Sequence, residues 1–150
     1  MIRILVADHD SATRKALILL LRRKLGTDCI IEIADVETLI RALAHMPPDL
    51  LLLDWRLYGS PATETCRLLR KAYPQLKIVL LSVDANDETA AKEAGADFIH
   101  KGASPDELIA TLAPSCANRI AIARPIPVAA PVIKMFFPAK RPMDSPVRNI

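Results

Sequence analysis

Four consecutive leucines, Leu50 to Leu53, stand between Asp49 and Asp54 about a third of the way along the chain. This run predicts a β-strand with apolar side chains on both of its faces. A strand of this kind is typical of the middle of a parallel sheet, where helices cover both faces. The leucine run therefore constrains the fold more than any other feature of the sequence.

Short apolar runs and helical segments alternate on either side of this strand. Together with it, the predicted strands lie at residues 2–7, 29–34, 49–54, 77–81 and 97–99. The predicted helices lie at 11–25, 36–45, about 61–72 and about 88–94, followed by a last helix that Ser104 and Pro105 open. Five such units predict an α/β fold with a doubly wound (βα)5 parallel five-stranded sheet, covered by helices on both faces.

The composition changes near residue 117. Residues 118–150 contain six Lys and Arg, one acidic residue and half of the chain's 12 prolines. We interpret residues 1–117 as one domain and residues 118–150 as a Pro-rich basic tail without an independent domain. The tail has too many prolines for a helix-turn-helix, and its composition fits an extended linker. DNA is therefore not an expected partner, although basic residues can contact phosphates.

The sequence also bears on location. Its apolar runs are too short and interrupted to span a bilayer, which takes about 20 residues, and no signal-peptide pattern precedes the first strand. The three cysteines, Cys29, Cys66 and Cys116, are widely spaced and match no disulfide framework or metal motif. We expect a cytoplasmic protein with reduced thiols and no membrane association.

Polar side chains stand at the carboxyl ends of four of the five predicted strands. They are Asp8, Asp54, Ser82 and Lys101. Ligands of open parallel sheets bind outside the carboxyl ends of the strands, so we expect these side chains to converge there. The two carboxylates could share a hard cation such as Mg2+. With a cation and an ammonium nearby, one carboxylate becomes a plausible nucleophile toward a phosphoryl group.

In these features the sequence resembles the receiver domain of bacterial two-component response regulators. The matching motifs are ILVADHD, LLLDWRLYG, LLSVD and FIHKGASPDELI, and the resemblance extends over residues 2 to about 113. It implies a flavodoxin-like fold and a signalling role in a phosphorelay rather than a classical enzyme, although a receiver catalyses its own phosphoryl transfer and slow dephosphorylation. Asp54 would accept phosphate from a sensor histidine kinase, a phosphotransfer protein or a small phosphodonor. Output would be a phosphorylation-dependent contact with a downstream protein, and a homodimer is left open.

The resemblance implies a Mg2+ site formed by Asp8, a second acidic residue beside it, Asp54 and the backbone carbonyl of Arg56. The position beside Asp8 is occupied by His9. Neutral imidazole is a poor ligand for Mg2+ and removes one negative charge, so we predict weak Mg2+ binding or another divalent cation. Asp10 is better placed to cap the next helix. His9 keeps open an alternative, a pseudo-receiver that signals without phosphorylation.

The resemblance also implies a conformational switch. Ser82 and Lys101 would contact the phosphoryl group, and Phe98 matches the aromatic residue that changes rotamer as the surface of the fourth helix, fifth strand and fifth helix rearranges. A helix-capping role for Ser82 remains an alternative. Trp55 is expected in an exposed loop, where it would shield the site, contact a partner or simply pack. Gly102 stands where many receivers have proline.

Overall fold

The computed structural model describes residues 2–57 and 62–117, apart from the side chains of residues 114–117. The predicted tail at 118–150 lies outside the described residues. The strands are β1 (Ile4–Ala7), β2 (Ile30–Ile33), β3 (Leu50–Asp54), β4 (Lys77–Ser82) and β5 (Asp97–His100). The helices are α1 (Ser11–Leu25), α2 (Val36–His45), α3 (Thr63–Ala72), α4 (Asp87–Glu93) and α5 (Pro105–Ala117).

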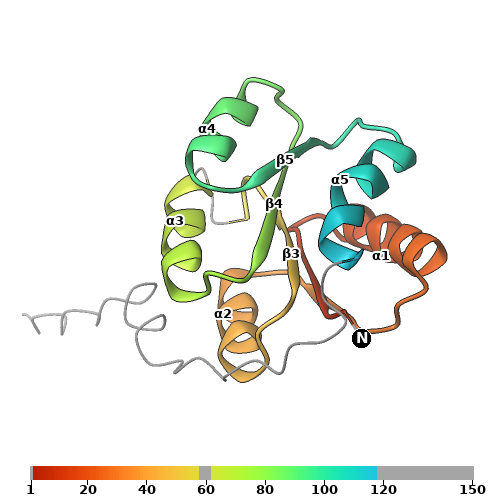
Figure 1. Cartoon of the computed structure of the whole chain (residues 1–150), viewed down its shortest axis with the longest axis horizontal. Coiled ribbons are helices and arrows are strands. Elements are labelled where there is room, and N and C mark those ends of the chain that lie inside the picture. Colours follow the sequence, from red (N-terminus) through yellow and green to blue (C-terminus); the bar gives the residue numbers. More distant parts are fainter. Residues whose placement is uncertain (1, 58–61, 118–150) are drawn as a thin grey trace, which may run out of the picture.

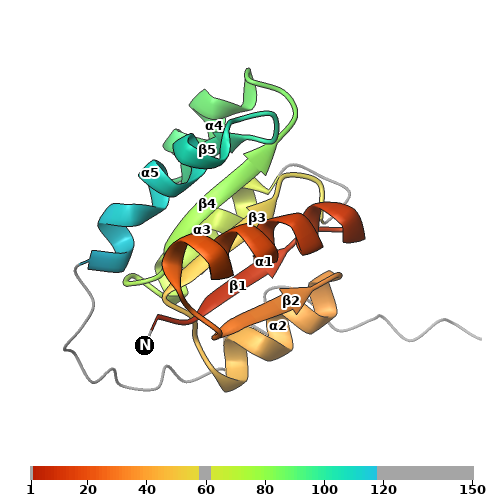
Figure 2. The same ribbon diagram turned by 90° about the vertical axis from the view of Figure 1, so that its right-hand side faces the viewer.

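All five strands pair in parallel in one sheet, in the order β2-β1-β3-β4-β5. Helices α2, α3 and α4 lie on one side of this sheet, and α1 and α5 lie on the other (Figure 1). Figure 2 shows the same sheet from the side of α1 and α5. The prediction of a doubly wound α/β fold is therefore confirmed.

The leucine run of β3 is divided between two hydrophobic cores. Leu50 and Leu52 pack in the core beneath α1 and α5, whereas Leu51 and Leu53 pack in the core beneath α2, α3 and α4. All four side chains have 0% exposed surface. Alternate side chains of a strand point to opposite faces, so four leucines in succession supply both cores at once.

The start of α1 is capped by Asp10, as the sequence predicts. Asp10 is the N-cap, and its carboxylate accepts hydrogen bonds from the backbone N–H of Thr13 at 2.8 Å and from the Thr13 hydroxyl at 2.6 Å. The hydroxyl bond, followed by the backbone bond, holds the pKa of the Asp10 carboxyl below its ordinary value. Gly26 ends the helix at φ 61°, a left-handed conformation that glycine adopts without steric cost.

Trp55 does not lie in an exposed loop, and that expectation is wrong. Its backbone N–H donates to the Leu81 carbonyl at 2.8 Å, which continues the pairing of β3 and β4 past Asp54. The Trp55 side chain therefore falls on the same face as Leu53 and packs in that core, with only 7% of the residue exposed. The third helix also begins at Thr63 rather than near residue 61, and residues 58–61 lie outside the described part of the chain.

Candidate functional site

The sheet brings the two predicted carboxylates together at its carboxyl edge. The strand order reverses at β1, which pairs with β2 on one side and β3 on the other. Because Ala7 pairs with Leu53, Asp8 and Asp54 occupy equivalent positions at the ends of β1 and β3. Asp8 is fully buried and Asp54 is 2% exposed. Two carboxylates in such a place require positively charged or hydrogen-bonding partners.

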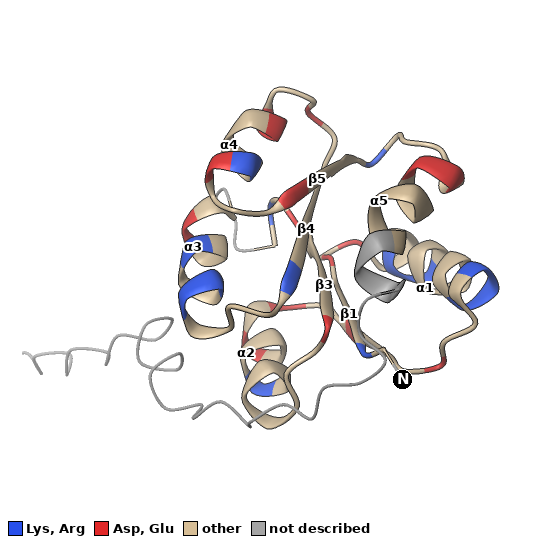
Figure 3. Ribbon diagram, in the orientation of Figure 1, with Lys and Arg blue, Asp and Glu red and all other residues tan. Residues whose placement is uncertain are grey.

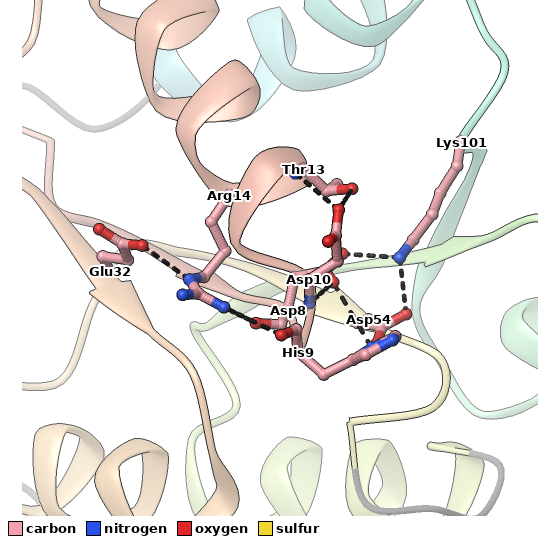
Figure 4. Close-up of polar contacts among 8 residues, drawn as sticks. All are labelled: Asp8, His9, Asp10, Thr13, Arg14, Glu32, Asp54 and Lys101. Carbon is pink, nitrogen blue, oxygen red and sulfur yellow. Dashed lines mark hydrogen bonds and ion pairs between the residues drawn. The ribbon is translucent and has the colours of Figure 1, made fainter.

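Lys101 supplies a positive partner to both carboxylates. Its Nζ lies 2.7 Å from Asp8 Oδ2 and 2.9 Å from Asp54 Oδ1 (Figure 4). The backbone N–H of Lys101 donates to the Ser82 carbonyl at 2.7 Å, so the pairing of β4 and β5 fixes the backbone position from which the Lys101 side chain extends. Three of the four predicted side chains thus meet in one ion-pair cluster.

The ionisation of this cluster follows from its contacts. Burial raises the pKa of the Asp54 carboxyl, but hydrogen bonds from Lys101 and His9 outweigh it, and the resulting pKa lies below the ordinary value. Burial lowers the pKa of Lys101, but its hydrogen bonds to Asp8 and Asp54 prevail and raise that pKa overall. The resting pocket therefore contains an Asp54 carboxylate and a Lys101 ammonium at neutral pH.

His9 lies over the same carboxylate from the solvent side. Its Nδ1 is 2.5 Å from Asp54 Oδ2 and 3.6 Å from Asp8 Oδ1, while 61% of its side chain is exposed. Ligand atoms of Asp8, His9 and Asp54 all lie within 4.8 Å of one another, a grouping that could hold a metal ion. Arg56 lies in the turn after β3, and its carbonyl as a fourth ligand stays a prediction.

Arg14 is a buried residue of the site that the sequence analysis missed. Its guanidinium donates to the backbone carbonyls of Asp8 at 2.7 Å and His9 at 3.2 Å, and also to Glu32 Oε1 at 2.7 Å (Figure 4). Arg14 therefore holds the short segment that presents both residues to the pocket. Glu32 interrupts the apolar strand Ile-Ile-Glu-Ile, but it lies at an exposed position of the edge strand β2, where an acidic residue needs no cationic partner, so the sequence carried little signal for this contact.

Ser82 ends β4 at the same edge, but its hydroxyl has other partners in this structure. It donates to Asp87 Oδ2 at 2.6 Å and accepts the backbone N–H of Asp84 at 3.1 Å. The N-cap position of α4 is Asn86, so Ser82 orders the loop before this helix without being its cap. Phe98 is partly buried against the core beneath α2, α3 and α4. The roles of Ser82 and Phe98 in a switch stay predictions.

The loop after β5 explains the glycine that follows Lys101. His100 Nδ1 accepts the backbone N–H of Gly102 at 2.9 Å, and its Nε2 donates to the Val83 carbonyl at 2.7 Å. A Cβ on residue 102 would lie 2.9 Å from His100 Nδ1, closer than side chains normally approach. Proline would both enter this space and lack the N–H that the ring accepts.

A parallel (βα)5 sheet with a buried Asp–Lys–Asp cluster at the switch point of its strand order defines a receiver, the phosphoacceptor class of signalling domain. A family model of the response regulator receiver domain matches residues 4–113. The chain therefore belongs to the receiver domains of two-component response regulators. Domains of this family bind Mg2+ at an acidic pocket and interact with histidine kinases or phosphotransfer proteins.

Curated relatives agree with this assignment. The DNA-binding response regulator MtrA of Mycobacterium tuberculosis (strain ATCC 25618 / H37Rv) is 38% identical over 111 residues, which cover 72% of this chain and 47% of MtrA. The phosphate regulon transcriptional regulatory protein PhoB of Pseudomonas aeruginosa is 32% identical over 114 residues, covering 73% of this chain and 49% of PhoB. The matched region thus spans about half the length of these relatives.

Solved structures show the same fold. A putative response regulator from Chloroflexus aurantiacus J-10-fl superposes with a TM-score of 0.68 at 27% identity, covering 78% of this chain and 98% of that one. A LuxR-family two-component response regulator from Aurantimonas sp. SI85-9A1 gives a TM-score of 0.70 at 25% identity, covering 89% and 99%.

Proposed function

We propose that this receiver is phosphorylated on Asp54 and acts by a phosphorylation-dependent contact with a downstream protein. The observation that best supports this proposal is the position of the Asp54 carboxylate at the end of the central strand, 2.9 Å from the Lys101 ammonium. A carboxylate oxygen of Asp54 would attack the phosphorus of a phosphohistidine, and the bond from phosphorus to the donor nitrogen would break as the new bond forms. Such transfer depends mainly on positioning and charge neutralisation.

The groups around Asp54 are suited to the charge that would arrive. A phosphoryl group adds about −1.5 to −2 of charge, and Lys101 can follow it because its ammonium already contacts Asp54. Asp8, Asp54 and the Arg56 carbonyl are oxygen donors of the kind that a hard divalent cation prefers. A cation held by them would neutralise phosphoryl oxygens. His9 fits Mg2+ less well, because a nitrogen stands where a carboxylate would serve.

Ser82 would have to exchange partners to contact the phosphoryl group. Its hydroxyl now donates to Asp87, the first residue of α4. Turning toward Asp54 would release that carboxylate and draw in the loop that leads to α4. This exchange offers a route from the site to the surface of α4, β5 and α5, where Phe98 lies, because a local charge change can bias a two-state element.

A direct test is incubation of the full chain with acetyl phosphate and Mg2+ or Mn2+, followed by intact-mass measurement. The expected result is a single added phosphoryl group on the wild type and none on Asp54→Asn. The matched control is Asp106→Asn, which removes an exposed carboxylate at the start of α5 and should be modified like the wild type. Failure to modify the wild type with either metal, or equal modification of Asp54→Asn, would overturn the proposal.

A second candidate is a pseudo-receiver that presents an interaction surface without being phosphorylated. The observation in its favour is that both Asp54 oxygens are already bonded, Oδ1 to Lys101 and Oδ2 to His9. A downstream protein that binds the wild type and Asp54→Asn with equal affinity, whether or not acetyl phosphate is present, would support this candidate and exclude the first.

The domain division and the partners remain part of the proposal. We place the receiver at residues 1–117 and assign no independent domain to 118–150.

MtrA, one of the relatives named above, is a DNA-binding response regulator, so our expectation that this chain does not bind DNA stays a prediction. Within the described residues, Lys and Arg occur on both α1 and α3, on opposite sides of the sheet (Figure 3). No helix in the described ranges 2–57 and 62–117 is long and apolar enough to cross a membrane.

A further inference from the structure

We propose that Asp8, His9 and Asp54 form a cation site that prefers a divalent first-row transition ion, such as Co2+ or Zn2+, to Mg2+. This inference rests on the proposed function, because it concerns which cation assists the chemistry at Asp54. It follows from where the imidazole lies, from the charge of the pocket and from the anchoring of the backbone beside it.

The spacing of the three ligand atoms suits a small cation. Neighbouring ligands of an octahedral ion with bonds of about 2.1 Å lie about 3 Å apart. The two separations that involve His9 Nδ1, 2.5 Å to Asp54 Oδ2 and 3.6 Å to Asp8 Oδ1, bracket that value, and all three ligand atoms lie within 4.8 Å of one another. The ring belongs to an exposed side chain and can turn, whereas the two carboxylates are buried at the ends of their strands.

The charge of the pocket disfavours Mg2+. Asp8 and Asp54 are both bridged by the Lys101 ammonium, so with a neutral His9 ring the cluster has a net charge of about −1. A carboxylate at position 9 would make it about −2. Mg2+ binds oxygen ligands and gains mainly from their negative charge. Imidazole bonds more strongly to Co2+, Ni2+ or Zn2+, whose affinity for nitrogen ligands exceeds that of earlier ions.

The backbone around His9 is anchored in a way that suits a ligand. Arg14 donates to the carbonyls of both Asp8 and His9 and is itself paired with Glu32. The Asp10 backbone N–H donates to Asp8 Oδ1 at 2.8 Å, which orients that carboxylate. The His9 ring would exchange its contact with Asp54 for a shared ion. Outer contacts that orient ligands in this way raise metal affinity.

Isothermal titration of the full chain with each metal alone, without phosphodonor, tests this inference. The wild type should bind Co2+ and Zn2+ about 100-fold or more tightly than Mg2+. His9→Asp should reduce that ratio by about tenfold or more, because it exchanges a nitrogen for a charged oxygen. The matched control is His45→Gln on the exposed end of α2, which should leave the ratio unchanged. Co2+ should also broaden the ring-proton NMR signals of His9 before those of His45.

An equal ratio in the wild type and His9→Asp, loss of the preference in His45→Gln, or no metal binding by the wild type would each overturn the inference. The titration contains no phosphodonor, so its failure can be distinguished from failure of the proposed function. If acetyl phosphate modifies Asp54 with Mg2+ while the ratio is insensitive to His9→Asp, the function stands and the metal preference falls. If His9→Asp reduces the ratio while acetyl phosphate never modifies Asp54, the metal preference stands and the proposed function falls.

Discussion

Replacing Arg14 with methionine should destabilise the receiver more than any surface charge change on α1. Arg14 is 9% exposed, and its guanidinium makes hydrogen bonds of 2.7 Å to Glu32 and 2.7 Å to the Asp8 carbonyl. Methionine fills a similar volume but provides no donor. The buried Asp8 carbonyl then loses a charged donor, and the segment before α1 loses its attachment to β2.

The size of the effect follows from these contacts. A hydrogen bond to a charged group contributes about 1.5–3 kcal/mol, and breaking a buried ionic pair costs about 3–5 kcal/mol. The side chain of Glu32 is 42% exposed and can regain water, which reduces its share. We therefore expect Arg14→Met to lower the free energy of unfolding by about 3 kcal/mol. With a urea m-value of about 2 kcal/mol/M, the midpoint should shift by about 1.5 M.

Urea unfolding followed by tryptophan fluorescence measures this change. Trp55 is the only tryptophan of the chain and is buried in the core, so its emission reports folding. Two variants separate the contacts. Glu32→Gln keeps the donors to the two carbonyls and should cost under about 1 kcal/mol. Arg14→Lys keeps the charge but loses the planar fork and should fall between the two.

The reasoning would be refuted by an Arg14→Met midpoint shift below about 0.5 M with an unchanged m-value. It would also be refuted if Glu32→Gln destabilised the protein as much as Arg14→Met. That result would place the stabilisation in the ion pair with β2 rather than in the anchoring of the Asp8 and His9 carbonyls.

Three further predictions concern the pocket and its loops. The free energy of unfolding of the wild type relative to Asp54→Asn, measured by urea unfolding, should decrease below about pH 4, because the lowered pKa of Asp54 stabilises the fold only while its carboxyl is ionised. A second decrease should follow above about pH 10.4, because the raised pKa of Lys101 stabilises the fold only while its amine is protonated. Asp87→Ala should free the Ser82 hydroxyl and tighten beryllofluoride binding about threefold or more in titration calorimetry, and weaker binding would contradict the partner exchange. Gly102→Ala should lower the free energy of unfolding by about 1 kcal/mol, and unchanged stability would show that the neighbouring ring yields freely.

The sequence predicted the fold because the packing of β3 leaves few alternatives. Four leucines without a polar residue favour a strand with a core on each face, and a parallel sheet between two layers of helices provides this. The same reasoning placed Asp8 and Asp54 together, since the carboxyl ends of parallel strands share one edge. Strand pairing thus positions most of the site. The residues at the carboxyl ends of the strands could therefore be predicted to lie together without knowledge of distant contacts.

The contacts that were missed depend on side chains that approach from outside the strand ends. Trp55 was expected in a loop because it follows the last strand residue, but one further backbone hydrogen bond places it in the core. Arg14 lies in a helix whose basic residues, judged from the sequence, are typical of a solvent-exposed face. Asp87 belongs to a loop-to-helix junction whose geometry depends on the Ser82 hydroxyl. None of these contacts has a fixed spacing in the sequence.

The two departures from the receiver pattern differ in how far their effects reach. The effect of Gly102 is confined to a single neighbour, since the His100 ring fills the space that a larger residue would need. His9 instead alters a quantity that the whole pocket shares, because the net charge of the cluster determines how strongly a cation is drawn in. With Lys101 already bridging Asp8 and Asp54, the resting cluster is closer to neutral than one with a second acid would be. Cation binding must then depend more on the bond to a nitrogen ligand and less on charge, which is why the identity of the metal is the property most sensitive to this one position.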